Sequence, residues 1–351
     1  MSRLKKNPIL KFLEQRQDKL SPLVILTHNH PDPDAMASAW ALAYLAQKLH
    51  GIRCRILYGG IIGRMENKTM VKILRIPARA VTPKTLASYP HVALIDTQPP
   101  FQNNIFPARR QATMVIDHHP RHARTKSEFT LIDKEAGATA TLLGEALLDS
   151  GLPVSWQLAT ALLYGIGSET QHLGRESISR DRGVYRGLFP MARMRVLSKI
   201  ENPPRPDYFF FTLGKAIRKA FTVRAAIGVH LGTVPNHDIV AQMADFLLSH
   251  EKMRWSIVTG RYKGRFFVSL RTKNRRAQAG KLLWRLLGGG TAAGGHGMIA
   301  GGSLAITEKT SEGSLRKTEE DLTNAFLKKL GYKEPFELQY PYRSMSDAQQ
   351  K

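Results

Sequence analysis

Cysteine is almost absent from this sequence, since Cys54 is the single one among 351 residues. One cysteine cannot close a disulfide within the chain, which excludes a disulfide-stapled secreted fold and fits a reducing compartment. Long apolar runs are also missing: the longest, AMASAWALAYLA, is too short to span a bilayer. The N-terminal segment MSRLKKNPILKFLEQRQDKL contains no uninterrupted apolar core of a secretory signal. We therefore expect a cytoplasmic protein without a membrane partner.

Acidic residues are scarce relative to basic ones: 28 Asp and Glu stand against 52 Lys and Arg, a formal net charge of +24. A field of this sign attracts polyanions and speeds their arrival at the protein. We expect nucleic acid or nucleotide partners, although a generally basic proteome would produce the same balance. The basic residues are spread along the chain, with a denser group in RTKNRR at 271–276.

The first half of the chain alternates between short apolar runs and helical patterns. Its strand-like runs are 22–27, 53–58, 91–96 and 112–117, and its helical patterns are 34–50, 137–151 and 155–166. Runs such as HVALID and ATMVID are apolar almost throughout, as in strands that a parallel sheet buries on both faces. This alternation predicts an α/β domain with a doubly wound, mostly parallel sheet.

The pattern breaks at KIENPPRPDYFF, where three prolines in four residues cannot continue a helix or a central strand. We assign residues 1–198 to a first domain, 199–212 to a linker, 213–332 to a smaller α/β domain and 333–351 to a tail. In the second domain we expect a strand at 225–232, a helix at 237–250 and a hairpin of 254–262 with 265–272. A charged loop from 307 leads into a short helix at 318–330.

Acidic and histidine side chains gather at the ends of the predicted strands and of one helix. Four groups follow these elements: His28, His30, Asp32 and Asp34; Asp96; Asp117, His118 and His119; and Glu169 with His172. An isolated aspartate after a strand is common, because it favours turns and caps helices. Three of the groups, however, lie at the carboxyl ends of strands, which is where open α/β sheets bind ligands. Together the four groups predict one site.

The residue types in these groups point to metal chemistry. Carboxylates with a few imidazoles and no thiolate suit Mn²⁺ or Mg²⁺, with Fe²⁺, Co²⁺ or Zn²⁺ as alternatives. One ion needs only about three or four protein ligands, whereas at least six candidates are present. We therefore expect two divalent ions, with Mn²⁺ preferred, that share a carboxylate and activate a water for attack on phosphorus.

These motifs resemble those of the DHH phosphoesterase superfamily. HNHPDPDA, IDTQP, IDHHP and GIGSETQHL are similar to its four motifs, and GGTAAGGHGMIAGG is similar to the glycine–histidine signature of its associated C-terminal domain. The resemblance extends over roughly residues 20–305. It is nearest to the nano-RNase and pAp-phosphatase branch, together with RecJ-type exonucleases and cyclic dinucleotide phosphodiesterases. It implies an active site in the cleft between the two domains.

The resemblance also implies a role for each matching residue. One ion would be held by His28, Asp32 and Asp96, and the other by Asp34, Asp96, His118 and Glu169, with Asp96 bridging both. His119 would face the scissile phosphate as a donor, and Asp117 would orient the histidines. His30 falls outside the matched spacing and is interpreted as a substrate-side or solvent residue.

The fourth motif departs from the family pattern, in which an aspartate occupies the place of Glu169. Glutamate is still an oxygen ligand, but it is one methylene longer. It could reach the same ion from a shifted backbone, chelate it with both oxygens, or loosen the second ion. The departure therefore bears on metal preference and rate more than on the class of reaction.

The glycine-rich stretch LGGGTAAGGHGMIAGGSLAI is too rich in glycine for a helix, and we expect a loop. Its backbone N–H groups could approach a phosphate or a base closely. By the resemblance, Gly294, Gly295 and His296 would bind substrate there. Arg271, at the end of FVSLRT, would meet a substrate phosphate. Arg275 and Arg276 are either further substrate contacts or solvated surface residues.

The sequence therefore predicts a metal-dependent phosphoesterase of the nano-RNase or nucleotide phosphatase type. It would hydrolyse phosphodiester or terminal phosphate bonds of short RNA or DNA oligonucleotides or nucleotides by a hydroxide that two metal ions activate. The alternatives are a cyclic dinucleotide phosphodiesterase and a non-catalytic nucleotide or nucleic-acid binder with a decayed site. Pyrophosphate or polyphosphate is disfavoured as substrate, because that branch has a different second domain. The oligomeric state is left open, a homodimer included.

Overall fold

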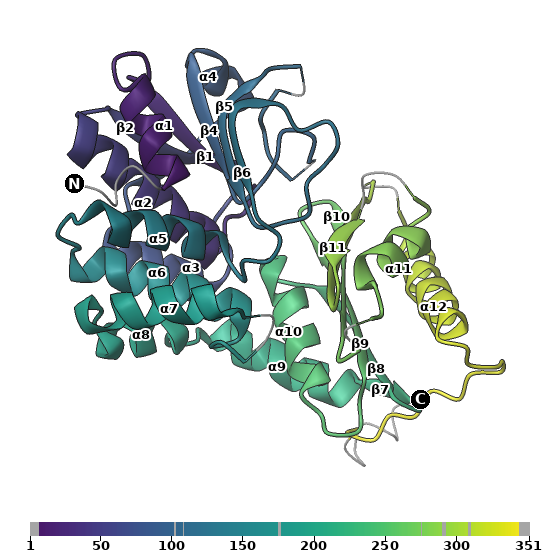
Figure 1. The fold of residues 1–351 in the computed structure, drawn as a ribbon. Coiled ribbons are helices and arrows are strands. Elements are labelled where there is room, and N and C mark those ends of the chain that lie inside the picture. Colours follow the sequence, from purple (N-terminus) through teal and green to yellow (C-terminus); the bar gives the residue numbers. More distant parts are fainter. Residues whose placement is uncertain are drawn as a thin grey trace. The chain divides into compact units, whose positions relative to one another are not determined.

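The computed structural model shows a chain of two compact units, residues 1–203 and 204–351 (Figure 1). It describes residues 7–101, 103–107, 109–174, 177–274, 276–289, 293–307 and 310–343, with the side chain of His296 excepted. Each unit has its own apolar core, because none of the buried apolar clusters among these residues has members in both. No helix in this part of the chain is long and apolar enough to cross a membrane.

The first unit is built on a sheet of six parallel strands in the order β3-β2-β1-β4-β5-β6. The strands are β1 (Leu23–Thr27), β2 (Cys54–Tyr58), β3 (Ala78–Ala80), β4 (His91–Ile95), β5 (Ala112–Asp117) and β6 (Ser127–Ile132). Every residue of β1 is buried, as its apolar run predicts. The sheet confirms the predicted doubly wound, mostly parallel α/β fold.

Helices of the first unit include the three that the sequence predicts. They are α1 (Pro8–Arg16), α2 (Pro33–His50), α3 (Met65–Leu74), α4 (Pro83–Ala87), α5 (Thr139–Ser150), α6 (Trp156–Thr170), α7 (Ser179–Leu188) and α8 (Met194–Glu201). The predicted 34–50 helix is confirmed as α2, which ends at Gly51 with a left-handed φ of 65°. α2 packs against both α5 and α6, and these two helices also pack against each other.

Helices occupy most of the segment expected as a linker. α8 enters it from one side and α9 (Asp207–Lys219) from the other, so residues 202–206 connect them. The three prolines lie in this connection, and Pro206 is the N-cap residue of α9. Proline is tolerated at a helix start, because the N–H that it lacks would have no partner within the helix there. The prolines thus separate two helices rather than prevent them.

The second unit contains a mixed sheet in the order β11-β12-β10-β9-β8-β7, in which only the β8–β9 pair is parallel among the described pairs. Its strands are β7 (Phe221–Val223), β8 (Ala226–Thr233), β9 (Trp255–Tyr262), β10 (Arg265–Thr272), β11 (Ala293–His296) and β12 (Ile299–Ala305). Its remaining helices are α10 (Asp238–Leu248), α11 (Ala279–Leu286) and α12 (Glu312–Lys329). The strand at 225–232 and the hairpin that follows it are confirmed.

Two local predictions in the second unit were wrong. The glycine-rich stretch is not a loop throughout, because β11 and β12 form an antiparallel hairpin that pairs with β10. Glycines carry no side chains, so the alternation that reveals a strand is invisible there, and neighbouring strands supply the order. α12 begins at Glu312 rather than near 318, because the Ser311 hydroxyl accepts the Ser314 N–H and caps it. In the expected tail, Gln339 pairs with Thr222 in an isolated bridge.

Candidate metal centre

The strand order places one crevice at the centre of the first sheet. From β1 the chain winds outward to β2 and β3, and from β4 it winds the other way to β5 and β6. Such a reversal opens a space at the carboxyl ends of the two central strands. His28 follows β1 and Asp96 follows β4. Both predicted ligands therefore stand where a doubly wound sheet binds its ligands.

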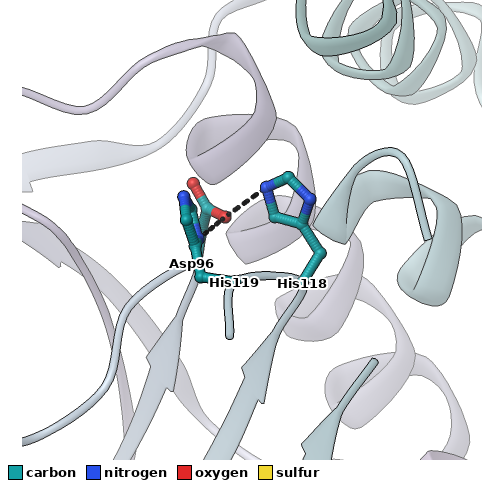
Figure 2. A group of neighbouring side chains, drawn as sticks. All are labelled: Asp96, His118 and His119. Atoms are coloured by element: carbon teal, nitrogen blue, oxygen red, sulfur yellow. Dashed lines mark ion pairs between the residues drawn. The ribbon is translucent and has the colours of Figure 1, made fainter. Parts of the chain in front are cut away.

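Asp96 lies between two imidazoles, and each of its carboxylate oxygens faces a different one. Its Oδ2 is 3.5 Å from His28 Nε2, and its Oδ1 is 3.5 Å from His118 Nε2. Figure 2 shows Asp96 with ion pairs to both histidines that follow β5. The side chain is buried, with 2% of its surface exposed. This is the arrangement expected of a carboxylate that bridges two cations.

The hydrogen bonds of His28 and His118 indicate which ring nitrogen faces the carboxylates. His28 Nδ1 lies 2.9 Å from the Asn29 carbonyl oxygen, and His118 Nδ1 lies 3.3 Å from that of Ala136. A carbonyl only accepts, so we assign a proton to each Nδ1, and Nε2 is the atom that faces Asp96. His118 Nε2 is buried and has no hydrogen-bond partner among the described residues. An unsatisfied nitrogen beside carboxylates suits a metal ion.

Asp32 has two tasks that use different oxygens. Its Oδ1 accepts the Ala35 N–H at 2.9 Å and caps α2, while its Oδ2 lies 3.5 Å from His28 Nε2. Burial alone would lower the pKa of His28, but the charge of Asp32 and hydrogen bonds to Asp32 and Asp96 raise it well above its ordinary value. Burial likewise opposes ionisation of Asp32, yet His28 lowers the pKa of that carboxyl. Helix capping and ligation are therefore compatible at this residue.

Asp34 is fully buried and is held by the first turn of α5. Its Oδ2 accepts the Thr139 N–H at 2.8 Å, and its Oδ1 accepts the Ala140 N–H at 2.6 Å. The same Oδ2 lies 3.8 Å from His118 Nε2. Burial, followed by the charge of Asp96, raises the pKa of Asp34 well above its usual range. The two N–H groups at the start of α5 therefore hold the Asp34 carboxylate in place, and they leave the negative charge of the neighbouring Asp96 uncompensated.

Thr139 is a contact that the sequence did not indicate. Its hydroxyl donates to Asp96 Oδ1 at 2.8 Å, and the residue is completely buried. One threonine thus holds Asp34 through its backbone and the central carboxylate Asp96 through its side chain. In the sequence it is only a threonine at the start of a helix, where threonine is common for local reasons.

His119 is oriented differently from His118. Its Nδ1 is 2.8 Å from Asp117 Oδ1, and its backbone N–H donates to the same oxygen at 3.1 Å. Gln98, a second contact that the sequence did not indicate, donates to Asp117 Oδ2 at 2.7 Å. Burial alone would lower the pKa of His119, but the hydrogen bond to Asp117 and the surrounding carboxylates raise it to about 10. Asp117 therefore orients His119, whereas the carbonyl of Ala136 holds His118.

Glu169 lies in the last turn of α6 and shares the electrostatic environment of the cluster. Burial and then the charges of Asp32 and Asp34 raise the pKa of Glu169 to about 8. Gly165, one turn earlier, lies so near α2 that a Cβ there would be 3.2 Å from the Asp34 Cα. The absence of a side chain at Gly165 thus lets α6 bring Glu169 toward the carboxylates.

The two other histidines of the motifs have contacts of their own. His30 Nδ1 lies 3.1 Å from the Ile61 carbonyl oxygen, and His172 Nε2 lies 3.6 Å from Glu201 Oε1. The backbone of Gln171, His172 and Leu173, which follow Glu169 closely, is left-handed at all three residues. Left-handed backbone is unusual for side chains other than glycine, and strain of this kind concentrates at functional sites.

The donor set fits a pair of divalent cations. Two groups, His28–Asp32–Asp96 and Asp96–His118–His119, have potential ligand atoms within 4.8 Å of one another, and Asp96 belongs to both. In the second group His119 Nδ1 is hydrogen-bonded to Asp117 and is therefore not available as a ligand. Asp34, whose Oδ2 faces His118, is the better candidate to bind an ion together with His118. Buried carboxylates this close repel one another, and cations between them would remove that repulsion.

The predicted substrate-binding residues belong to the second unit. Arg271 is buried; its Nε lies 2.5 Å from Asp245 Oδ1, and its Nη1 donates to the carbonyls of Leu270 and Ala300 at 3.0 Å. Gly294 and Gly295 lie on β11. The predictions for Arg275 and for the His296 side chain fall outside the described residues, and Arg276 is exposed. A substrate-binding role for this group stays a prediction.

Known proteins share this sequence pattern and fold. The DHH family, N-terminal domain, matches residues 22–166, from β1 into α6. An uncharacterized protein of Methanocaldococcus jannaschii is 34% identical over 337 residues, which cover 94% of this chain and 68% of that protein. The chain belongs to the DHH family.

One further relative of this DHH protein and one solved structure with a similar fold carry descriptive names. A probable manganese-dependent inorganic pyrophosphatase of Streptococcus pyogenes is 24% identical over 153 residues, 43% of this chain and 49% of that protein. The crystal structure of an exopolyphosphatase-related protein from Bacteroides fragilis matches with a TM-score of 0.66 and 14% identity. That match covers 93% of this chain and 96% of the other, so the two proteins share a fold along nearly their whole length.

Proposed function

We propose that this DHH protein is a metal-dependent phosphoesterase that hydrolyses short oligonucleotides or nucleotides. The observation that carries the proposal is the buried Asp96 carboxylate, whose two oxygens face the Nε2 atoms of different histidines at 3.5 Å each. A carboxylate so placed suits a pair of ions, and a pair of ions suits phosphoryl chemistry. Membership of the DHH family supports the same class of reaction.

Each ion would have its own set of residues around the shared Asp96. One set is His28, Asp32 and Asp96, and the other is Asp34, Asp96, His118 and Glu169. Two divalent ions held there, with Mn²⁺ preferred, would lower the pKa of a bound water and would offset negative charge on the substrate phosphate. Asp34 and Asp32 are held by helix N–H groups, so this part of the site is organised before substrate binds.

His119 is the residue that would meet the substrate phosphate. In the metal-free protein the hydrogen bond to Asp117 and the nearby carboxylates outweigh burial and raise the pKa of His119 to about 10, so the ring there carries both protons at neutral pH. Its Nδ1 is hydrogen-bonded to Asp117, so the Nε2–H group is the donor that would contact a phosphate oxygen. A positively charged donor stabilises the charge that develops on phosphate oxygens during hydrolysis.

The net charge of +24 supports nucleic acid or nucleotides as the substrate class. A second candidate is inorganic pyrophosphate, which the names of the Streptococcus pyogenes relatives favour. Those matches cover only 43% of this chain, so they leave more than half of it without a counterpart in the match. The two candidates differ in whether the substrate carries a base.

A substrate panel tests the proposal. The full chain with Mn²⁺ is given a pentaribonucleotide, a dinucleotide, pAp, a cyclic dinucleotide, pyrophosphate and bis-p-nitrophenyl phosphate, and products are identified by mass spectrometry. We expect hydrolysis of the short oligonucleotides, its loss in chelator and its return with Mn²⁺. Asp96→Asn should abolish it, whereas Asp18→Asn, an exposed acid of the same unit, should not. Cleavage of pyrophosphate alone would favour the second candidate. If the Mn²⁺-loaded protein cleaves none of these compounds, the proposed enzymatic function is wrong and a non-catalytic nucleotide or nucleic-acid binder is the remaining interpretation.

A further inference from the structure

Helix α9, with which the second unit begins (Figure 1), presents two phenylalanine rings to solvent. Phe211 has 77% of its surface exposed and Phe210 has 59%, the two highest values among the large apolar side chains that the structure describes. Phe209 and Leu213, on another side of the helix, pack against the core of the second unit. Two adjacent rings in water are unfavourable, so they favour an occupant for this side of α9.

The two rings lie between an acid and a base on one side of the helix. We call this side the α9 face; it consists of Asp207, Phe210, Phe211, Gly214 and Arg218, which are three or four residues apart and therefore neighbours on a helix. Asp207 and Arg218 are both exposed, and neither forms an ion pair within the described part of the chain. The face thus has a negative end, an apolar middle and a positive end.

Gly214, in the middle of the α9 face, has no explanation within the second unit. Glycine inside a helix is unfavourable for stability, and its backbone here is not left-handed. A Cβ at this position would have the guanidinium group of Arg218 as its nearest neighbour, at 3.4 Å. That group ends a long exposed side chain and is able to move aside, so a larger residue would fit. The missing side chain at Gly214 therefore suits a close approach from outside the chain.

The α9 face is complementary to itself when two copies of the helix run antiparallel. A twofold axis pairs each position with the one that lies equally far on the other side of the axis. The midpoint between Phe211 and Gly214 is also the midpoint between Asp207 and Arg218. One register therefore seats each Phe211 ring over Gly214 of the other copy. The same register sets each Asp207 against Arg218 of the other copy.

We propose that the α9 face is a self-association surface, on which α9 packs antiparallel against α9 of a second copy around a twofold axis. Phe211 and Gly214 form the centre of the contact, and Asp207 and Arg218 pair at its two ends. The helix is about 20 Å long, so the contact is at the small end of protein interfaces. We expect a reversible dimer with a dissociation constant on the order of micromolar. None of these residues is a metal-ligand candidate, so the inference does not depend on the proposed function.

Charge favours a second copy over other occupants. A lipid surface or a nucleic acid would be attracted by the net charge of +24, but it would meet an acid, Asp207, within the α9 face. The same net charge makes two copies repel at a distance, and salt at physiological strength screens that repulsion beyond about 8 Å. A second copy is the occupant that matches the rings, the glycine and both charges.

The first test is sedimentation equilibrium of the full chain, without metal or substrate, over a range of micromolar concentrations. Gly214→Leu adds a side chain for which a single copy has room, and leucine favours the helix, so the fold should be kept. The added side chain would occupy the seat of the opposite ring, so dimerisation should weaken at least about tenfold. Phe211→Ser should weaken it as much, because each dimer loses two rings.

The matched control is Phe189→Ser, which removes an exposed phenylalanine of the first unit and should leave the dissociation constant unchanged. A wild-type protein that stays monomeric at every concentration overturns the proposal. So does a Gly214→Leu protein that dimerises as tightly as wild type, because an apolar contact of another kind would accept leucine as readily as glycine. Circular dichroism establishes that each variant is folded.

The second test examines the register through its charges. Asp207→Arg alone sets two bases against each other at both ends of the contact, and Arg218→Asp alone sets two acids against each other. Each variant by itself should dimerise at least about tenfold more weakly than wild type, since like charges across an interface repel. An equimolar mixture of the two variants restores an opposite pair at both ends, so it should associate within about threefold of wild type. A mixture that associates no better than either variant alone would overturn the antiparallel pairing.

Discussion

A single hydroxyl, that of Thr139, connects helix α5 to the carboxylate at the centre of the cluster. It donates to Asp96 Oδ1 at 2.8 Å, while the backbone N–H of the same residue donates to Asp34 at 2.8 Å. Residues that orient ligands in this way commonly change metal affinity by about 10–100-fold when they are replaced. The orientation of the candidate ligands therefore depends on residues, such as Thr139, that are not ligand candidates themselves.

Thr139→Val should weaken the binding of Mn²⁺ about tenfold, because Asp96 loses a donor that fixes its orientation while the backbone contact to Asp34 remains. Thr139→Ser keeps the hydroxyl and should bind Mn²⁺ nearly as wild type does. Isothermal titration of the metal-free proteins with Mn²⁺ measures both. Equal affinity in the valine and serine variants would show that the hydroxyl has no part in holding the site.

We expect Glu169 to make metal binding dependent on pH. Its pKa is raised to about 8, so in the metal-free protein it holds a proton at neutral pH that a cation must displace. Affinity for Mn²⁺ should therefore rise between pH 6 and 8, by up to about tenfold per unit for this one proton. The proton released can be counted by titrating in buffers of different ionisation enthalpy. Glu169→Gln should bind more weakly and should release fewer protons, and an affinity that is flat over this range would contradict the assignment.

At the scale of elements, the second unit depends on one close approach between α11 and β11. Gly280 lies in the first turn of α11, where a Cβ would be 2.1 Å from the Gly295 oxygen. That oxygen belongs to the backbone of the hairpin, so it cannot move away as a flexible side chain could. Gly294, on the same strand, has nothing within 4 Å of the place where its Cβ would be.

Gly280→Ala should destabilise the second unit by about 1–3 kcal/mol, because the added methyl group forces the helix and the hairpin apart. Gly294→Ala is the matched control and should leave the unfolding temperature nearly unchanged. Differential scanning calorimetry of both variants beside wild type measures the effect. An unchanged unfolding temperature in Gly280→Ala would mean that α11 and β11 can move apart without a loss of stability.

At the scale of the whole molecule, the two units divide the predicted work between them. All six ligand candidates lie in residues 1–203, and Arg271 and the glycine hairpin lie in residues 204–351. No buried apolar cluster in the described part of the chain joins the two units. A unit with its own core is able to fold by itself.

Residues 1–203 expressed alone should bind Mn²⁺ with the stoichiometry of the full chain and should hydrolyse bis-p-nitrophenyl phosphate. The same fragment should lose most of its activity on a pentaribonucleotide, because binding energy from remote parts of a substrate positions the reacting phosphate. Circular dichroism establishes that the fragment is folded, and Asp96→Asn in the fragment is the inactive control. A folded fragment that fails to bind Mn²⁺ would show that the centre needs the second unit.

Sequence by itself determined the outline of the first unit and the members of its cluster. The apolar runs of β1, β4 and β5 are visible because strands buried on both faces need continuous apolar side chains. Gly51 marks the end of α2 because the left-handed cap there suits glycine. The acids and histidines can be grouped from the sequence alone, because parallel strands end at one edge of a sheet.

Only the tertiary structure decided how these residues meet. Thr139, Gln98 and the Ala136 carbonyl contact the cluster from segments far along the chain, and no local pattern announces such a contact. The opposite orientations of His118 and His119 likewise depend on which partner lies beside each ring. The β11–β12 hairpin formed where glycine conceals the strand pattern, because neighbouring strands supplied its hydrogen bonds. Side-chain periodicity records burial along one element, whereas hydrogen-bond partners across elements are fixed only when the chain has folded.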